Sequence, residues 1–386
     1  MFNCCMLYNM NKSKMCLVNS YNTTSAGTIE ITSMFLKELC DNSSNNKYIV
    51  LLPKIEKFSN IFLKYNENIK LIYFHSFSGL LKIIFRIIFE LFIIPFLVYY
   101  YKVNAVLVLG NYAPLPFRNK VVFMQYSFLV DDNIFNEYKI IDKFSNLVRK
   151  GLFWLTVKSK CKIIVQSDLI RNYTIRKYGT KNIDIYVFPN PRINASIVID
   201  VDEIEGVKEN LLLYISRYYA HKNHIFILKI AKKYANEFRN KNIKFYITLD
   251  PKINNGVYHF LKAISDNNLG DIIINIGEIP KESVKNHYKN SLALIFPSQA
   301  ESFGIPILEA MSEGLPVIVP DLPYTRSICS YAGLYYKNND VDDAYNVIIK
   351  IIIENNIKNI YRKLSLERSK EFPTIDQWIR NIINIL

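Results

Sequence analysis

The stretch IFPSQAESFGIPILEAMSEGLPVIVPD, residues 295–321, is the most informative part of the sequence. It predicts a buried strand that ends at Pro297, then a loop, then a helix. The helix should begin near Ile305, because proline suits the first turn of a helix and Pro306 stands there. The turn at 302–304 then directs backbone N–H groups toward whatever lies above the strand. Helix N-termini bind anions, so the stretch predicts a pyrophosphate site on a parallel sheet.

Two carboxylates flank this turn. Glu301 precedes it, and Glu309 follows about one turn into the predicted helix. At this spacing both carboxylates can face the same cleft and accept hydrogen bonds from the vicinal hydroxyls of a sugar or a ribose. Gly314 then ends the helix, as glycine does at helix C-termini, and the next strand follows.

The segment LLLYISRYYAHKNHIFILKIAKKY, residues 211–234, predicts a second loop of the same kind. Its pattern is typical of a strand, a short loop and an amphipathic helix. Arg217 and Lys222 fall on the loop at the carboxyl end of the strand, which is where open parallel sheets bind ligands. Two cations there could hold a diphosphate and stabilise it as it leaves.

The two segments resemble the donor site of glycosyltransferase family 4, a retaining family of the GT-B fold. The family pattern is a Glu, seven residues and a second Glu, with an embedded Ser-Phe-Gly-x-Pro. An Arg-x4-Lys element precedes it. This chain matches the pattern with Arg217, Lys222, Glu301, Ser302, Phe303, Gly304, Ile305, Pro306 and Glu309. The resemblance is clear over the C-terminal half and holds only in outline over the N-terminal half.

The resemblance also implies roles for residues outside these segments. It makes Arg217, Lys222 and Glu301 catalytic, with no metal ion and no cofactor beyond the nucleotide-sugar co-substrate. It makes the remaining matched residues other than Pro306 donor-binding: Ser302, Phe303, Gly304, Ile305 and Glu309. Further donor contacts are implied at Gly277, which follows a strand, at Asn190, which precedes the linker, and at Gly27, in a loop where family members have a glycine-rich turn.

One position departs from the family. At the end of the strand VVFM many members place a histidine that contacts the donor sugar, whereas this chain has Gln125. A glutamine side chain donates and accepts hydrogen bonds but cannot bear charge. Gln125 is therefore expected to be a donor contact only.

Short apolar runs alternate with helical patterns along the whole chain, which predicts parallel sheets with crossover helices. The expected strands cover residues 16–19, 48–52, 70–74, 105–109, 121–124, 162–165, 185–188, 211–215, 244–248, 272–276, 293–296 and 317–319. They form two Rossmann-like, doubly wound domains, and the GT-B fold implies that these face an interdomain cleft. We expect an N-terminal acceptor domain over 1–192, a linker over 189–206, a C-terminal donor domain over 207–370, and a terminal helix over 371–386 that packs back on the first domain.

Charge divides the two halves. The chain has 48 Lys and Arg against 34 Asp and Glu, a formal net charge of +14. Residues 1–190 hold 24 basic and 12 acidic side chains, a net +12, so the excess belongs to the N-terminal half and indicates a negatively charged partner or surface. The cysteines and histidines show no metal-ligand spacing. The first fifteen residues lack the apolar run of a secretory signal and are expected to form a ragged leader, with Met10 or Met15 as alternative starts.

Residues 80–101, LLKIIFRIIFELFIIPFLVYYY, are a candidate membrane segment. Lys82, Arg86 and Glu90 lie at four-residue spacing and should form one narrow stripe on an otherwise apolar helix. The uncharged part contains Pro95 and is shorter than the ~20 residues that span a bilayer. Two interpretations remain: a core helix with its charged stripe in water, or an interfacial helix that contacts lipid.

The expected function is a retaining, metal-independent glycosyltransferase of cell-surface polysaccharide synthesis, of the O-antigen or capsule type. Its partners would be a nucleotide-sugar donor, a glycan or lipid-linked acceptor and an anionic membrane surface, and its place would be the inner face of the cytoplasmic membrane. A GT-B-fold sugar-nucleotide epimerase and a basic non-enzymatic binding protein are the alternatives. Nucleic acid is not an expected partner, because no helix-turn-helix, zinc-finger or RNP pattern is present.

Overall fold

The computed structural model describes residues 14–23, 26–41, 46–55, 58, 67–77, 79–117, 119–130, 140–181, 183–192, 210–252 and 255–386. The chain forms two compact units, each described here by itself. Unit 1 comprises Met1–Asn190 and Ile375–Leu386, and unit 2 comprises Pro191–Thr374. The predicted leader up to residue 13, and the predicted linker from residue 193 onward, lie outside the described residues.

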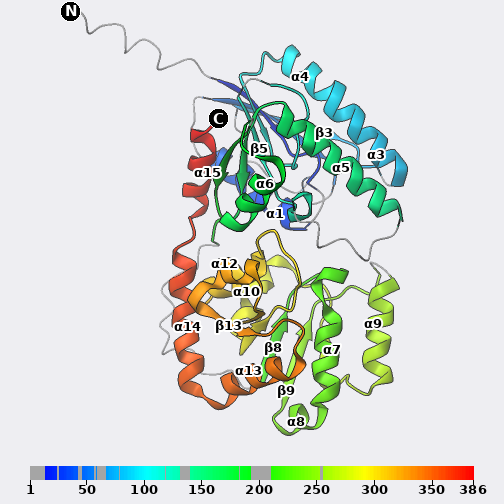
Figure 1. Ribbon diagram of the computed structural model, residues 1–386, viewed down its shortest axis with the longest axis vertical. Helices are drawn as coiled ribbons and strands as arrows, with labels where there is room; N and C mark the ends of the chain where they lie inside the picture. Colours follow the sequence, from blue (N-terminus) through cyan, green and yellow to red (C-terminus); the bar gives the residue numbers. More distant parts are fainter. Residues whose placement is uncertain are drawn as a thin grey trace, which may run out of the picture. The chain divides into compact units, whose positions relative to one another are not determined.

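In its described part, unit 1 contains seven parallel strands in the order β3-β2-β1-β4-β5-β6-β7 (Figure 1). The strands are rich in Val, Ile and Leu and most are buried, as expected of a parallel sheet covered on both faces. Their bounds are β1 (Met15–Asn19), β2 (Lys47–Pro53), β3 (Ile69–Phe74), β4 (Ala105–Val108), β5 (Lys120–Phe123), β6 (Cys161–Val165) and β7 (Ile183–Val187). The helical elements are α1 (Ala26–Asp41), α3 (Gly79–Ile88), the π-helical turn η1 (Phe89–Ile93), α4 (Ile94–Tyr100), the 3-10 turn η2 (Ser127–Leu129), α5 (Ile140–Lys158), α6 (Asp168–Tyr178) and α15 (Ile375–Asn384).

In its described part, unit 2 contains six parallel strands in the order β10-β9-β8-β11-β12-β13. Their bounds are β8 (Asn210–Tyr214), β9 (Ile243–Ile247), β10 (Ile273–Asn275), β11 (Ala293–Ile295), β12 (Val317–Pro320) and β13 (Gly333–Tyr336). The helical elements are η5 (Ala220–Lys222), α7 (His224–Lys233), α8 (Ala235–Asn240), α9 (Asn255–Asp266), α10 (Lys281–Lys289), α11 (Ile305–Ser312), α12 (Pro323–Cys329), η6 (Ser330–Ala332), α13 (Val341–Ile353) and α14 (Asn355–Lys370).

The predicted fold class is confirmed, since both sheets are parallel and doubly wound. Each of the twelve predicted strands is present, with ends shifted by one or two residues. The sequence analysis missed β13, a run of four residues that lacks β-branched side chains.

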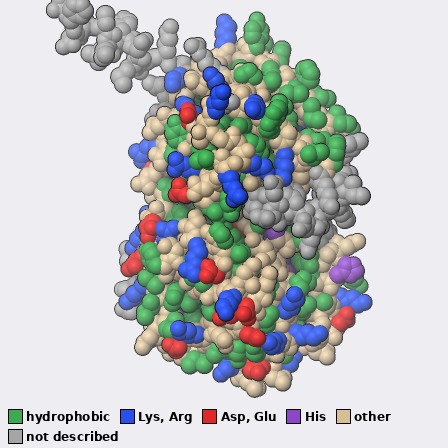
Figure 2. Space-filling model, in the orientation of Figure 1, with side chains coloured by type: hydrophobic (Ala, Val, Ile, Leu, Met, Phe, Trp, Pro, Cys, Tyr) green, Lys and Arg blue, Asp and Glu red, His purple; other side chains and the backbone are tan. Residues whose placement is uncertain are grey.

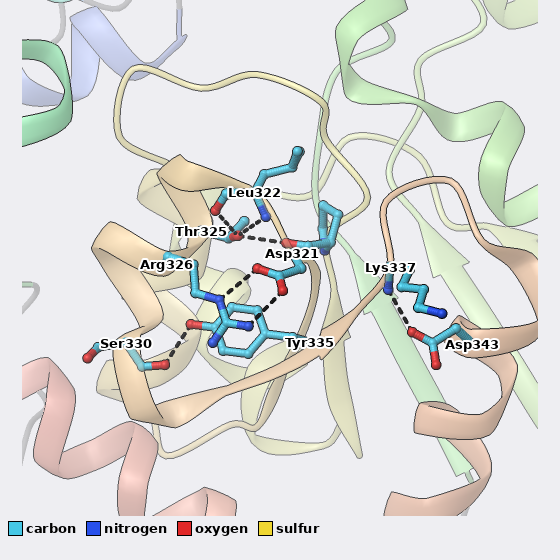
Figure 3. A network of polar contacts seen from close by, with 9 residues as sticks. Asp321, Leu322, Thr325, Arg326, Ser330, Tyr335, Lys337 and Asp343 are labelled. Atoms are coloured by element: carbon cyan, nitrogen blue, oxygen red, sulfur yellow. Dashed lines mark hydrogen bonds and ion pairs between the residues drawn. The ribbon is translucent and has the colours of Figure 1, made fainter.

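A latch of polar contacts ties β13 to the helix before it (Figure 3). The Arg326 guanidinium of α12 binds both carboxylate oxygens of Asp321, at 2.6 and 2.7 Å. It also stacks on the Tyr335 ring of β13, 3.7 Å from the ring centroid. The Tyr335 hydroxyl in turn donates to the Ser330 carbonyl at 2.6 Å. These side-chain contacts, together with the parallel pairing to β12, explain the strand better than its own four residues do.

The helical segment α3–η1–α4 has the opposite orientation from the one predicted for a core helix. The charged stripe does not face water: Arg86 is 6% exposed and Glu90 is 1% exposed. The exposed side chains are instead apolar, a set that we call the apolar face: Leu81, Ile84, Ile88, Phe92, Phe96, Tyr99 and Tyr100. The interpretation with a solvated stripe is therefore wrong, because the charges have polar partners inside unit 1.

The π-helical turn has a local cause in the sequence. Pro95 lies in the first turn of α4, and a proline ring clashes with the carbonyl one turn earlier in a regular α-helix. The widened turn over Phe89–Ile93 relieves this, with the Ile94 N–H donating to the carbonyl of Phe89 five residues back. Across the described residues, no helix has the length and apolar character needed to cross a bilayer.

The last helix, α15, belongs to unit 1 although the residues before it belong to unit 2. Its Trp378 is fully buried, and the indole packs edge-on against Phe123 of β5 with ring centroids 5.5 Å apart. The Lys162 ammonium donates to the carbonyl of Ile385 at 2.7 Å. A segment from the end of the chain thus completes the core of the first sheet.

Candidate functional site

The strand order of unit 2 reverses direction between β8 and β11, which are neighbours in the sheet. Such a switch point leaves a crevice at the carboxyl ends of the strands, and open α/β sheets bind ligands there. The loops that leave β8 and β11 at this edge carry Arg217, Lys222 and Glu301. The predicted residues therefore come from the two strands that the topology brings together.

Lys222 and Glu301 form an ion pair across this switch point. The Lys222 ammonium lies 2.5 Å from the Glu301 Oε1, and both side chains are largely buried, with 15% and 12% of their surface exposed. The ammonium also lies 5.2 Å from the centroid of the Phe296 ring. Because a carboxylate lies on one side of the ammonium and an aromatic ring on the other, the direction of the Lys222 side chain is fixed. An ammonium with a fixed direction suits the binding of a diphosphate.

Backbone contacts hold the two loops in register. The His221 carbonyl accepts hydrogen bonds from the Gln299 N–H at 2.7 Å and from the Ser298 hydroxyl at 3.1 Å. The Tyr324 hydroxyl, from α12, donates to the Ser298 carbonyl at 2.6 Å. The Tyr214 hydroxyl donates to the Lys222 carbonyl at 2.5 Å. The ion pair therefore rests on a rigid frame rather than on two independent loops.

Arg217 also has a carboxylate partner. Its Nε lies 3.2 Å from the Glu278 Oε1, and both side chains are partly exposed to solvent. Glu278 directly follows Gly277, which has a φ of +75°, a conformation that glycine adopts without strain. The Asn275 side chain braces this turn by accepting from the N–H groups of Leu249 and Gly277, at 2.9 and 3.3 Å.

The start of α11 has the geometry predicted for an anion site. Helix α11 begins at Ile305. Pro306 has no N–H, and the Ile307 N–H donates to the Gly304 carbonyl at 3.0 Å, so it is the Ile305 N–H that has no carbonyl partner within the helix. Gly304 precedes it with a φ of +87°, and a Cβ there would lie 3.1 Å from Ile328 and 3.2 Å from Ile307. The Phe303 side chain is buried against Phe372. Phe303 therefore anchors the turn by its side chain, which leaves only its backbone for a ligand.

Glu309 lies on α11, about one turn after its start. Its Oε2 accepts a hydrogen bond from the Tyr288 hydroxyl at 3.0 Å. Burial, followed by the nearby Glu309 charge, raises the pKa of Tyr288 well above its usual range, so the phenol stays protonated and remains a donor. Tyr288 thus fixes the orientation of the carboxylate that the sequence pattern assigns to the ligand.

Two histidines border the site. The pKa of His221 is lowered to about 4, mainly by burial, with the Glu301 charge acting in the opposite direction and the Lys222 charge in the same one. The pKa of His224 is lowered to about 3 by burial and by the Lys222 charge. Both imidazoles are therefore neutral near pH 7. The positive charge at this edge of unit 2 comes from Arg217 and Lys222, not from histidine. Within the described ranges, no three His, Cys, Asp or Glu side chains come together as a metal-binding group.

The remaining predicted residues lie in unit 1. The Gln125 amide nitrogen donates to the Leu109 carbonyl at 2.9 Å, and its backbone N–H donates to the Asn111 Oδ1 at 2.6 Å. Asn190 is buried, and its Oδ1 has no hydrogen-bond partner among the described residues. Gly27 is exposed near the start of α1. Their contact with a donor stays a prediction.

The sequence analysis missed the partners of the predicted residues. Glu278 and Tyr288 fall at no recognisable spacing from Arg217 and Glu309, because they come from different loops and helices. Glu278 stands beside the glycine that the analysis did select. The one signal in the sequence was Arg217 on a neighbouring loop, because a cation there invites a search for a carboxylate partner.

The C-terminal unit matches a known family. The family model described as Glycosyl transferases group 1 matches residues 199–366. The O-antigen chain mannosyltransferase RfbU of Salmonella typhimurium is 27% identical over 202 residues, which cover 52% of this chain and 53% of that protein. The UDP-Gal:alpha-D-GlcNAc-diphosphoundecaprenol alpha-1,3-galactosyltransferase of Escherichia coli is 24% identical over 233 residues, covering 57% and 58%. The chain thus spans little more than half the length of these curated relatives.

The fold has close counterparts among solved structures. Sucrose-phosphate synthase of Thermosynechococcus elongatus matches with a TM-score of 0.76, over 97% of this chain and 98% of that one, at 15% identity. At that identity the likeness shows the fold alone. The fold is GT-B, as the sequence pattern predicts.

Proposed function

We propose that this chain, which carries a glycosyl transferases group 1 domain over residues 199–366, transfers a sugar from a nucleotide-sugar donor to a glycan or lipid-linked acceptor. The observation that carries the proposal is the Lys222–Glu301 pair, which spans the switch point of the second sheet. It places a cation and a hydrogen-bond acceptor for sugar hydroxyls side by side, next to a helix N-terminus that favours a diphosphate.

In this proposal the donor diphosphate lies against the first turn of α11 and between Arg217 and Lys222. Each cation then exchanges part of its present contact, with Glu278 or Glu301, for phosphate oxygens. Glu301 accepts hydrogen bonds from hydroxyls of the transferred sugar, and Glu309, oriented by Tyr288, accepts from the ribose. Charge-assisted hydrogen bonds of this kind are the strong ones.

We further propose that transfer retains the anomeric configuration and needs no metal ion. The bond from the anomeric carbon to the diphosphate breaks, and a bond to the acceptor oxygen forms on the same face. The acceptor proton passes to the departing diphosphate. Arg217 and Lys222 stabilise the charge that develops there, which is the work that a divalent metal ion does in other transferases. Chelator should therefore leave the rate unchanged, and lost activity restored by Mg²⁺ or Mn²⁺ would contradict this.

For the acceptor we propose a lipid-linked saccharide at the inner face of the cytoplasmic membrane, in cell-surface polysaccharide synthesis. The apolar face of α3–η1–α4 supports this, and Figure 2 shows hydrophobic side chains gathered over those helices. The net +12 of residues 1–190 favours an anionic lipid surface. The printed names of two relatives point the same way, one to an O-antigen chain and one to a diphosphoundecaprenol acceptor.

The decisive experiment offers a panel of nucleotide sugars with and without a sugar-diphosphate-lipid acceptor, and follows product by mass spectrometry. Transfer from at least one donor, dependent on acceptor, is expected. Epimerised donor formed without acceptor would favour the epimerase alternative, and no turnover of any donor by folded protein would refute the proposal. The anomeric configuration of the product, read by NMR, tests retention.

A further inference from the structure

A second polar cluster lies at the switch point of the first sheet, where β1 and β4 are neighbours. The loop after β1 carries Asn22, whose side chain accepts from the Arg86 Nε at 3.0 Å and donates to the Glu90 Oε1 at 2.9 Å. The loop after β4 carries Tyr112, whose ring centroid lies 5.3 Å from the Arg86 guanidinium carbon. The site proposed above uses none of these residues.

Three cations converge on this cluster. Lys82 and Arg86 are one turn apart on α3, and Arg149 comes from α5. Burial lowers the pKa of Lys82, and the charges of Arg86 and Arg149 lower it further. Among the residues that the structure describes, none of the three forms an ion pair with a carboxylate.

The nearby acid offsets little of this charge. Glu90 is 1% exposed, and burial raises its pKa to about 8, although the Arg86 charge and the hydrogen bonds from Asn19 and Asn22 act in the opposite direction. Near pH 7 the carboxyl is therefore mostly neutral. Like charges held together without an opposite charge are unfavourable, and a bound anion would relieve this.

Two buried polar atoms in the cluster lack partners among the described residues. The Tyr112 hydroxyl and the Arg149 Nε are both enclosed and make no hydrogen bond. Tyr112 interacts electrostatically with Arg86, Glu90 and Arg149, so its hydroxyl lies within the cationic cluster. A buried donor that goes unpaired destabilises the folded protein. They are the kind of group that a ligand oxygen satisfies.

The surroundings of the cluster are apolar on the outside. Lys82 and Arg149 are partly exposed, whereas Arg86 and Glu90 lie beneath them. Next to Lys82, the side chains of Leu81 and Ile84 are exposed, and on α5 those of Phe144 and Leu147 are exposed. Partly exposed cations and exposed apolar side chains thus lie on the same two helices, a combination that suits a lipid chain that ends in phosphate.

We propose that Lys82, Arg86, Arg149 and Tyr112 form a binding site for the diphosphate of a prenyl-diphosphate-linked acceptor. The inference rests on the proposed function for the class of acceptor, and it deepens that proposal by naming the residues. The prenyl chain follows the apolar side chains of α3 and α5, and the diphosphate meets the three cations. The diphosphate is not consumed: it anchors the acceptor while the sugar end reacts.

A binding experiment tests the site without turnover. Geranyl diphosphate is titrated into the full-length protein by calorimetry, with geraniol and inorganic pyrophosphate as reference probes. Lys82→Gln and Arg149→Gln should each weaken binding about ten- to hundredfold, because each removes a charge-assisted hydrogen bond. Tyr112→Phe keeps the ring and should cost several-fold. Wild-type affinity in all three variants would overturn the proposal.

Matched variants separate this site from other anion-binding groups. Lys158→Gln removes one charge from the end of α5 and should bind geranyl diphosphate as the wild type does. Equal losses in Lys158→Gln and Lys82→Gln, for geranyl diphosphate and for phosphatidylglycerol vesicles alike, would mean general attraction to lipid headgroups and would refute the site. The thermal midpoint of each variant shows whether it is folded. If a charge variant unfolds, geranyl diphosphate binding by Tyr112→Phe still tests the site.

Sugar-transfer kinetics provide a second test of the proposed binding site. Lys82→Gln and Arg149→Gln should raise KM for a diphosphate-linked acceptor while leaving KM for an uncharged alkyl glycoside unchanged. Equal increases for both acceptors would show a merely structural role and would overturn the proposal. Intact geranyl diphosphate binding without sugar transfer would instead count against the proposed function, so that the two failures are distinguishable.

Discussion

Glu301 is the single residue on which the donor site depends most, because it meets the sugar in the proposal and already holds Lys222. Glu301→Gln should lower kcat about ten- to hundredfold with a smaller effect on KM, since its contacts strengthen as positive charge develops at the reacting carbon. Asp271→Asn provides a matched control, because it breaks the exposed pair with Arg239 before β10. That control should change kcat less than twofold, as expected for a surface pair. Wild-type kcat in folded Glu301→Gln would remove the carboxylate from the chemistry.

The lowered pKa of His221 predicts how the stability of the protein changes with pH. Its pKa is lowered to about 4 from an ordinary 6.5, so between these values the unfolded chain binds a proton that the folded chain does not. The contribution of His221 to the free energy of unfolding should therefore be constant above pH 6.5 and should fall as the pH drops toward 4. Thermal midpoints measured from pH 7.5 to 4.5 should fall less steeply in His221→Gln. His259→Gln, at an exposed position, should keep the wild-type slope, and an equal slope in all three proteins would contradict the assignment.

The grouping of the residues proposed to bind the donor could be predicted from sequence because their spacing is local. Glu301 and Glu309 sit either side of one turn, and Arg217 and Lys222 share one loop. Their partners could not be predicted, because Glu278 and Tyr288 reach them across the sheet and between helices. The sequence analysis predicted two cations that could hold a diphosphate, and in the structure each of them is paired with a carboxylate.

At the scale of elements, the turn before α11 depends on Gly304. A side chain there would have to adopt a φ of +87° and would press on Ile328 and Ile307. Gly304→Ala should destabilise the protein by about 1 to 3 kcal/mol and weaken donor binding, because it displaces the helix N-terminus. Gly151→Ala, within α5 and with open space around it, should instead stabilise by about 0.5 to 1 kcal/mol. Urea unfolding of the two variants makes the comparison, and equal effects would show that Gly304 is not required.

The elements themselves were largely predictable, with two instructive failures. Strand β13 has a weak local pattern. It is held by the contacts of Arg326 with Tyr335 and Asp321, which the sequence rules for strands do not include. The charges of α3–η1–α4 were expected in water because charged side chains are usually exposed. Asn22, on a loop more than sixty positions earlier in the chain, provides their partner instead. Periodicity predicts which residues share a face, but not which face is buried.

For the whole molecule, the proposed membrane contact can be tested directly. The protein should bind vesicles containing phosphatidylglycerol, and high salt should release much of it, because exposed charges are screened. Replacing Phe92 and Phe96 by Ser should weaken binding without unfolding, since both side chains are more than 60% exposed. Replacing Ile353 and Ile360, exposed apolar residues of unit 2, should have little effect. Binding that ignores salt, lipid charge and the first pair of substitutions would refute the contact.

The architecture of each unit was predictable because buried parallel strands are continuous apolar runs, and such runs stand out in the sequence. The rest depended on contacts between distant segments. Unit 1 in particular has a sheet core that no continuous stretch of sequence contains, since Trp378 packs on Phe123.

That discontinuity has a consequence for synthesis on the ribosome. Strand β7 ends at Val187, but α15 begins only at Ile375, so roughly 10 to 40 seconds of translation separate them at ordinary elongation rates. During that interval the Phe123 side of the nascent first sheet lacks the indole that covers it in the finished protein. Unit 2, whose segments are contiguous, is complete first. The order of folding is thus the reverse of the order of synthesis, because unit 1 is begun first and completed last. Until α15 has been synthesised, a newly made chain exposes an apolar surface that chaperones can bind.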